Sequence, residues 1–244
     1  MLLALIDLNG RRGSLIGTSV EKLYDAAPRP RGTVKQQEPR LFSIYQLKPA
    51  FQNLLRPLVR SCAGRGITAN AVTLTALIIS LVVGAVLIVY GQAQPGWFLL
   101  LPLWMFFRMA FNAVDGMLAR EFGQQSALGA YLNELCDVIA DAALYLPFAF
   151  IAPFSIWSIG ALIWLAALSE MTGALGPLVG APRAYHGPMG KSDRAFVFGC
   201  LGLLVGLGIT LPAWCTAVIY IMCGLMGVNM IKRIRAGISV SAKP

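Results

Sequence analysis

Five carboxylate residues occupy positions where the surrounding sequence is strongly apolar. They lie within or at the ends of long apolar segments: Asp115, Glu134, Asp137, Asp141 and Glu170. A carboxylate at the centre of a membrane-spanning helix costs at least ~2.5 kcal/mol on insertion scales, so it normally has a function or a partner. A divalent metal site is the favoured explanation. An ion pathway and a structural pair with Arg108 stay open as alternatives.

The spacing of these residues predicts two polar stripes. Asn133, Asp137 and Asp141 follow one another at intervals of four, and Asn112 and Asp115 are three apart, so each set shares one face of a helix. The connection between the two helices is short, which predicts antiparallel neighbours whose stripes face one cavity. Side-chain oxygens gathered in this way are what Mg²⁺ prefers.

Glycines and an arginine accompany the stripes at the helix ends. Gly116, Gly123 and Gly129 would allow a bulky ligand to approach the backbone closely, although small-residue helix packing explains them too. The guanidinium of Arg120 is suited to gripping a phosphate. The combination favours a site for a pyrophosphate held by metal.

The composition predicts an all-α integral membrane protein. Of the 244 residues 57% are hydrophobic and 13% are charged, against about 25% charged in a soluble domain. The net charge is +9. The basic residues cluster between apolar runs, a pattern that favours topology control and contact with anionic lipid over nucleic-acid binding. The five cysteines form no C-x-x-C pair and His186 is the sole histidine, so no zinc site is expected.

The chain divides into four expected regions. Residues 1–40 read as a disordered cytoplasmic arm, residues 41–66 as an amphipathic helix on the membrane surface, residues 67–235 as a six-helix membrane domain, and residues 236–244 as a cytoplasmic tail. Placement of Lys and Arg puts both termini in the cytoplasm, and a bacterial inner membrane is the expected location. The six spans are predicted at 68–90, 97–117, 127–150, 154–172, 195–211 and 213–231.

Residues 112–137 resemble the signature D-x2-D-G-x2-A-R-x8-G-x3-D-x3-D of the CDP-alcohol phosphatidyltransferase family. The opening of the first span, residues 68–73, is similar to the family's P-N-x-x-T element, with Ala69 where proline is usual. The resemblance extends over roughly residues 44–235. The signature positions hold Asn112, Asp115, Gly116, Ala119, Arg120, Gly129, Asn133 and Asp137.

The resemblance implies particular roles. In the family the acidic positions bind two divalent metals, Mg²⁺ or Mn²⁺, and the fourth is the suggested general base, which is Asp137 here. Asn112 and Asn133 replace two carboxylates and remove two negative charges, so metal affinity should fall. Asp141 could restore one charge as a further ligand, while Arg108 adds a positive one.

The activity implied is transfer of a phosphatidyl group from a CDP-activated lipid to an alcohol, with release of CMP. Arg120, with the close-approach residues Gly116, Ala119 and Gly129, would hold the phosphates. Lys191 and Arg194, in a loop at 185–194, would bind an anionic acceptor, although topology control alone would also explain their charge. The expected partners are membrane lipids and a second copy in a homodimer, with no nucleic acid. A non-catalytic lipid-binding or scaffold protein is the alternative function. An ion-coupled transporter is opposed by the D-G-x2-A-R spacing.

Overall fold

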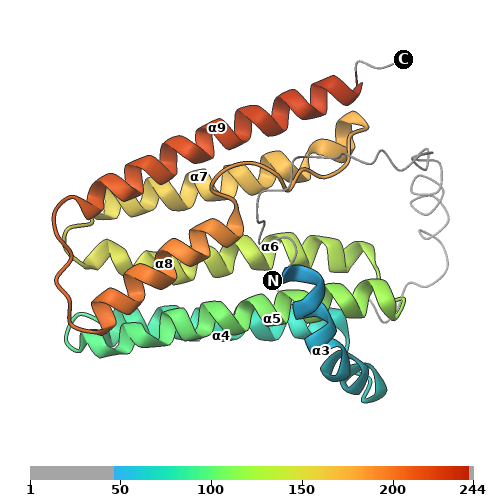
Figure 1. The fold of residues 1–244 in the computed structure, drawn as a ribbon, viewed down its shortest axis with the longest axis horizontal. Helices are drawn as coiled ribbons and strands as arrows, with labels where there is room; N and C mark the ends of the chain where they lie inside the picture. Colours follow the sequence, from blue (N-terminus) through green and yellow to red (C-terminus); the bar gives the residue numbers. More distant parts are fainter. Residues whose placement is uncertain (1–46, 242–244) are drawn as a thin grey trace. The chain divides into compact units, whose positions relative to one another are not determined.

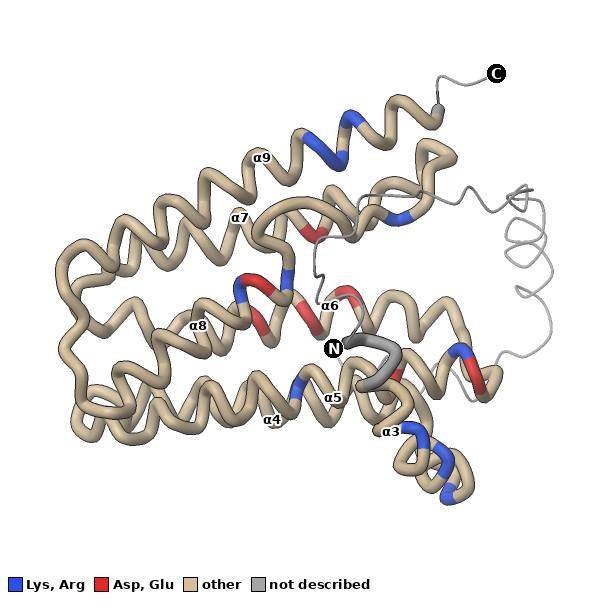
Figure 2. The backbone as a smooth tube through the Cα atoms, in the orientation of Figure 1, with Lys and Arg blue, Asp and Glu red and all other residues tan. Residues whose placement is uncertain are grey.

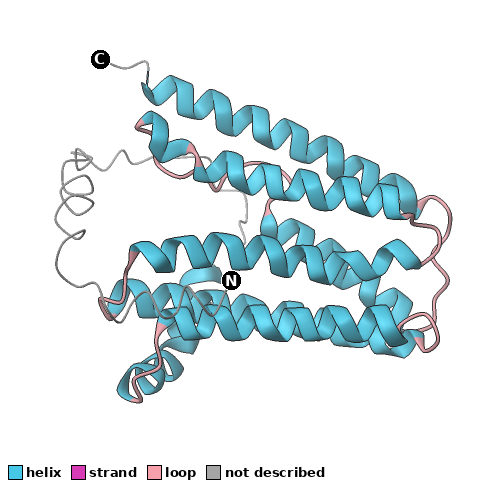
Figure 3. Cartoon of the chain, turned by 180° about the vertical axis from the view of Figure 1, so that it is seen from behind, coloured by secondary structure: helices cyan, strands magenta, loops and turns pink. Residues whose placement is uncertain are grey.

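The computed structural model describes residues 47–241, and side chains from 51 to 240. The predicted arm at 1–40, the first residues of the predicted surface helix and residues 242–244 lie outside the described part of the chain. Within the described part the structure is helical, with no strand (Figure 3). The fold is therefore the all-α membrane fold that the composition predicts.

Seven long helices make up most of residues 47–241. Ser126 shows why one of them begins where it does, because its hydroxyl accepts a hydrogen bond from Gly129 N at 2.9 Å and caps the first turn. Three short 3₁₀ helices join the long ones: η2 (Pro95–Leu99), η3 (Leu146–Phe150) and η4 (Gly176–Val179). The long helices are α3 (Leu47–Gly64), α4 (Ala69–Tyr90), α5 (Leu100–Glu121), α6 (Ala127–Tyr145), α7 (Ile156–Ala174), α8 (Lys191–Gly206) and α9 (Cys215–Ser241).

The packing order differs from the expected one at α5 and α6. These two helices are joined by a short turn, but α4 packs against both of them and their own backbones make little contact. Helices α7 and α9 run side by side, and α8 packs on α5 (Figure 1). The close approach of α4 to α6 depends on Gly84, since a Cβ there would meet the carbonyl oxygen of Ala143 at 2.4 Å.

Four segments are long and apolar enough to cross a membrane. They are Ala69–Tyr90, Pro95–Glu121, Ile156–Val179 and Cys215–Val240. The other two helices of the predicted six fall short for different reasons, because α6 carries Glu134, Asp137 and Asp141 and α8 has only 16 residues. The protein is an integral membrane protein, and six spans stay a prediction for α6 and α8.

Two boundaries move relative to the sequence prediction. Helix α8 begins at Lys191, so Lys191 and Arg194 lie in its first turn and not in a loop. Helix α9 continues to Ser241, ten residues beyond the predicted end of the last span, so the first residues of the predicted tail are helical. Polar and basic residues extend a helix beyond the apolar run, which is why hydropathy alone misplaces both ends.

Helix α3 forms within the predicted surface segment. One side buries Val59 against Val114 and Leu118 of α5, while Leu54 and Leu58 are exposed. The end of α5 is also tied to α3 by an exposed ion pair between Arg56 and Glu121 at 3.1 Å. An exposed apolar side beside a packed one fits a helix lying at the membrane surface.

Candidate active site

Charged residues gather at one end of the bundle. Figure 2 shows the half of the helices next to the η2 and η3 turns free of Lys, Arg, Asp and Glu, whereas the other half carries both signs. The uncharged half holds the main apolar core, in which the rings of Tyr145 and Phe198 stack with their centroids 4.0 Å apart. The candidate site therefore lies at the charged end, where α5 ends and α6 begins.

Asp115 of α5 is buried beside α4. The hydroxyl of Thr73 donates a hydrogen bond to Asp115 Oδ2 at 2.8 Å. Among the ion pairs formed by described residues, none includes Asp115. Thr73 belongs to the short element at 68–73, so that weak sequence match was the signal for this contact.

Asp137 of α6 contacts two positively charged side chains. Arg108 of α5 donates from Nη2 to Asp137 Oδ1 at 3.3 Å and to its carbonyl oxygen at 3.0 Å. Lys191 of α8 forms an ion pair with Asp137 Oδ2. The Arg108 side chain thus bridges α5 and α6, and the meeting of the predicted stripes in one cavity stays a prediction.

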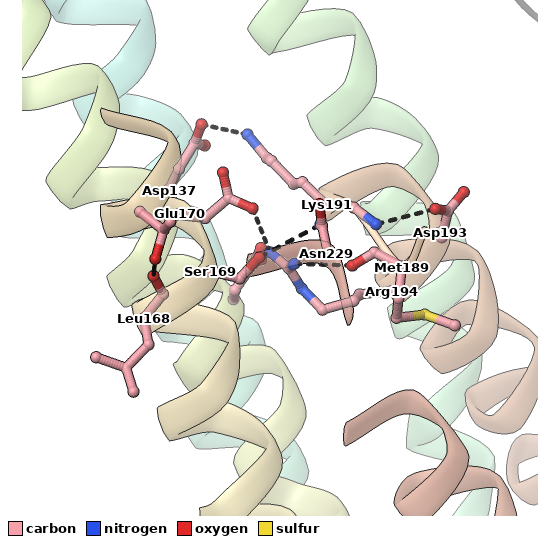
Figure 4. Close-up of polar contacts among 12 residues, drawn as sticks. Asp137, Leu168, Ser169, Glu170, Met189, Lys191, Asp193, Arg194 and Asn229 are labelled. Atoms are coloured by element: carbon pink, nitrogen blue, oxygen red, sulfur yellow. Dashed lines mark hydrogen bonds and ion pairs between the residues drawn. The ribbon is translucent and has the colours of Figure 1, made fainter. Parts of the chain in front are cut away.

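Asp141, one turn further along α6, is held between two guanidinium groups. Arg108 Nη1 lies 2.5 Å from Asp141 Oδ1, and Arg194 Nη2 lies 3.1 Å from Asp141 Oδ2. Arg194 Nη2 also contacts Glu170 Oε1 of α7 at 3.1 Å (Figure 4). We call Arg108, Asp141, Arg194 and Glu170 the inner network. It joins four helices through buried ion pairs.

The inner network opposes two of the predictions made from the sequence. Asp141 has both oxygens engaged by arginines, so the alternative of a structural pair with Arg108 describes it better than a metal ligand. Arg194 is 0% exposed and also donates from Nη1 to the carbonyl oxygen of Met189 at 3.3 Å. The guanidinium of Arg194 is engaged by protein groups in this structure, and its predicted contact with an acceptor stays a prediction.

A cavity of about 260 Å³ opens beside Asp137. Asn133, Asp137 and Lys191 line it as predicted site residues, whereas Asn112, Asp115, Asp141 and Arg194 do not. The charges of the side chains that line it cancel. Three are carboxylates and three are basic groups: Glu134, Asp137, Glu170, Arg183, Lys191 and Arg233. Such a lining can bind a polar molecule that carries charge of its own.

Arg183 and Arg233 were not singled out as site residues from the sequence. Arg183 pairs with Glu134 of α6, and its Cζ lies 4.4 Å from the centre of the Tyr185 ring. Arg233 of α9 donates from Nε to the carbonyl oxygen of His186 at 3.2 Å. Both residues belong to the basic clusters whose pattern favours topology control, and the sequence gives no sign that α9 and the segment before α8 meet at this cavity.

The small signature residues lie close to polar side chains. A Cβ at Gly116 would stand 2.9 Å from Arg120 Nη2, so Arg120, which is exposed, folds back over Gly116. A Cβ at Gly129 would stand 2.9 Å from Asn70 Oδ1 on α4. Ala119 packs instead at the apolar contact between α3 and α5. Substrate contacts by these residues stay predictions.

A divalent cation fits the surroundings of Asp115 better than those of the α6 carboxylates. In residues 47–241, no three side chains of His, Cys, Asp or Glu gather closely enough to hold a metal ion. Each carboxylate of α6 has a cationic partner, and Asp115 has none within the described chain. A buried carboxylate without a counterion is costly, so a cation bound at Asp115 would remove that cost.

Known proteins resemble this chain in sequence and in fold. Inner membrane protein YnbA of Escherichia coli is 48% identical over 172 residues, which span 70% of this chain and 83% of YnbA. A phosphatidylinositol phosphate synthase of Mycobacterium marinum is 33% identical over 102 residues, 40% of each chain. The solved Mycobacterium tuberculosis phosphatidylinositol phosphate synthase, in complex with manganese and citrate, shares the fold with a TM-score of 0.59 and 17% identity, over 77% of this chain and 91% of that one.

A family model also covers helices α4 to α7, which hold part of the site. The model of the CDP-alcohol phosphatidyltransferase family matches residues 66–178, from just before α4 to the η4 turn. Asp115 and Asp137, the two signature positions that keep their carboxylates, lie inside this range. The chain belongs to the CDP-alcohol phosphatidyltransferase family.

Proposed function

We propose that the protein transfers a phosphatidyl group from a CDP-activated lipid to an alcohol and releases CMP. The observation that carries this proposal is the placement of Asp137 on the wall of a cavity that also presents Asn133 and Lys191. Membership of the family supports the reaction class. A bacterial inner membrane is part of the proposal, in line with the similarity to YnbA. Cytoplasmic termini are also part of it and rest on the placement of Lys and Arg.

The chain's own residues would perform three tasks. Asp137 would accept the proton of the attacking hydroxyl. As that oxygen bonds to the lipid-bearing phosphorus, the bond from this phosphorus to the CMP oxygen breaks and CMP leaves as the monoester. Arg120 would hold the phosphates through its guanidinium. Asp115, with the amide oxygens of Asn112 and Asn133, would hold a Mg²⁺ or Mn²⁺ ion, which neutralises charge developing on the pyrophosphate.

The acceptor alcohol should carry negative charge. Lys191, Arg183 and Arg233 line the cavity, and each now contacts protein oxygens that an anionic ligand could replace. A guanidinium presents a planar fork that matches phosphate and carboxylate oxygens. The relatives named phosphatidylinositol phosphate synthases are consistent with a phosphorylated polyol as the acceptor class.

The test is release of CMP by purified full-length protein. The protein would be incubated with CDP-diacylglycerol, Mg²⁺ or Mn²⁺, and a panel of neutral and phosphorylated polyols. We expect metal-dependent CMP release with an anionic acceptor, lost in Asp137→Ala and kept in Glu121→Ala, which removes an exposed carboxylate at the end of α5. Equal rates in native protein and Asp137→Ala would remove the proposed base.

One observation favours a second candidate, a lipid-binding membrane protein without turnover. Both oxygens of Asp137 contact cationic side chains, so neither oxygen is free to accept a proton from a substrate hydroxyl in this arrangement. This candidate expects binding of CDP-diacylglycerol but no CMP under any metal and acceptor. Binding without CMP release across the panel would favour it over the enzyme.

A further inference from the structure

We infer that Lys191, supported by Arg108, supplies the positive charge of a second divalent cation, so that the site holds one metal ion and not two. This inference rests on the proposed function for its metal. The side chains at the signature positions do not suit a centre that binds two divalent metal ions. Two signature positions are amides, and Asp137 already contacts the ammonium of Lys191 and the guanidinium of Arg108.

The charges around the site support one metal. The ionised lining of the cavity is neutral, with three groups of each sign. Asp115 adds one negative charge beside it without an ion-pair partner in the described chain. One dication would leave the free site with a small positive charge that a pyrophosphate can neutralise, whereas two would leave a larger excess. Like charges held close together repel strongly where water is scarce.

The fold holds Lys191 in place for this task. Arg194 lies three residues after Lys191 in the first turn of α8, so the two side chains share a face of the helix. Arg194 is fixed by Asp141 and Glu170, and Asp193 Oδ2 accepts a hydrogen bond from Gly190 N at 2.9 Å where the helix begins. With the turn fixed on both sides, Lys191 reaches Asp137 across the cavity (Figure 4).

Arg108 reinforces the same position from α5. It is buried and shares its guanidinium between Asp141 and Asp137. A guanidinium stays protonated and cannot be removed by a chelator. Asp137 therefore has two cationic side chains of the fold beside it, and the proposed metal ion at Asp115 is the cation that can exchange with solvent.

The experiment counts metal ions, so its result does not depend on turnover. Mn²⁺ would be titrated into the full-length protein in detergent, and free Mn²⁺ followed by electron paramagnetic resonance. We expect one Mn²⁺ per native chain. In Lys191→Met, loss of a nearby positive charge should tighten Mn²⁺ binding about tenfold. Lys191→Arg keeps the charge and should bind as the native protein does.

A matched control variant separates the effect of the position of Lys191 from the effect of the total charge of the protein. Lys232→Met removes an exposed lysine of α9 outside the cavity and should leave Mn²⁺ affinity unchanged. Two Mn²⁺ per native chain, none at all, or equal affinity in native and Lys191→Met would each overturn the inference. If Lys191→Met fails to fold, a native stoichiometry of one or two still decides it. Absence of CMP release with one Mn²⁺ bound would count against the proposed function and leave this inference standing.

Discussion

Asp115 and Asp141 are equally buried carboxylates in different surroundings. Asp115 is 5% exposed and Asp141 is 4% exposed. The first has a threonine hydroxyl as its neighbour, and the second has two guanidinium groups. Burial alone therefore does not separate a ligand-binding carboxylate from a structural one. The two differ in their counterions, because the charge of Asp141 is compensated within the fold, whereas the metal ion that we propose would compensate the charge of Asp115.

The largest expected effect is on turnover at Asp115. Asp115→Ala should lower the rate of CMP release at least about a thousandfold, because metal stabilisation of the transition state amounts to several kcal/mol. The thermal unfolding midpoint should change little, since one hydrogen bond from Thr73 is lost. A variant that keeps native turnover and native Mn²⁺ binding would contradict the assignment of Asp115.

The contrasting effect at Asp141 should be on stability. Asp141→Ala leaves Arg108 and Arg194 short of a partner and should destabilise the protein by about 3 kcal/mol, a typical cost of breaking a buried pair. Unfolding in mild detergent would measure it. Replacing both members, Arg108→Met with Asp141→Leu, should restore much of the loss, because Arg194 keeps Glu170.

The Asp141→Ala variant can also show that the contrast between Asp115 and Asp141 is wrong. If Asp141→Ala unfolds like the native protein but needs more metal for turnover, then Asp141 is a metal ligand after all. In that case the contacts with Arg108 and Arg194 would not describe the working site. Stability and metal requirement should therefore be measured on the same preparation.

A smaller effect is expected from restoring the signature carboxylates. Asn112→Asp with Asn133→Asp should lower the Mg²⁺ concentration for half-maximal CMP release about tenfold, since carboxylates add charge to the site. Asn133 lines the cavity. The single variant Asn133→Asp should therefore show part of the effect. No shift in the double variant would mean that neither amide lies near the bound metal.

The smallest effect is expected at the exposed pair between α3 and α5. Arg56 and Glu121 have side chains 41% and 38% exposed. Arg56→Ala should cost at most about 1 kcal/mol, because water screens such pairs. The unfolding midpoint should stay close to the native value. A loss as large as that of Asp141→Ala would show that counterion burial does not decide the energy of these pairs.

Local features of the sequence determined the helices and the signature positions. Apolar runs of membrane length fixed the central parts of α4, α5, α7 and α9, since each backbone polar group in lipid must be satisfied within its own helix. Spacing along single helices also placed Asp137 and Asp141 on one face. These inferences depend only on residues within a few helical turns of one another, and the spacing of such residues can be read from the sequence.

The tertiary structure alone decided which charges meet. Asp141 and Arg194 are 53 residues apart, and Lys191 reaches Asp137 from a different helix. Such pairings depend on the rotation and relative height of packed helices, and hydrophobic periodicity fixes neither closely enough to choose among several nearby arginines. For this reason the sequence assigned Asp141 to a metal and Arg194 to a substrate, whereas the fold brings the two together.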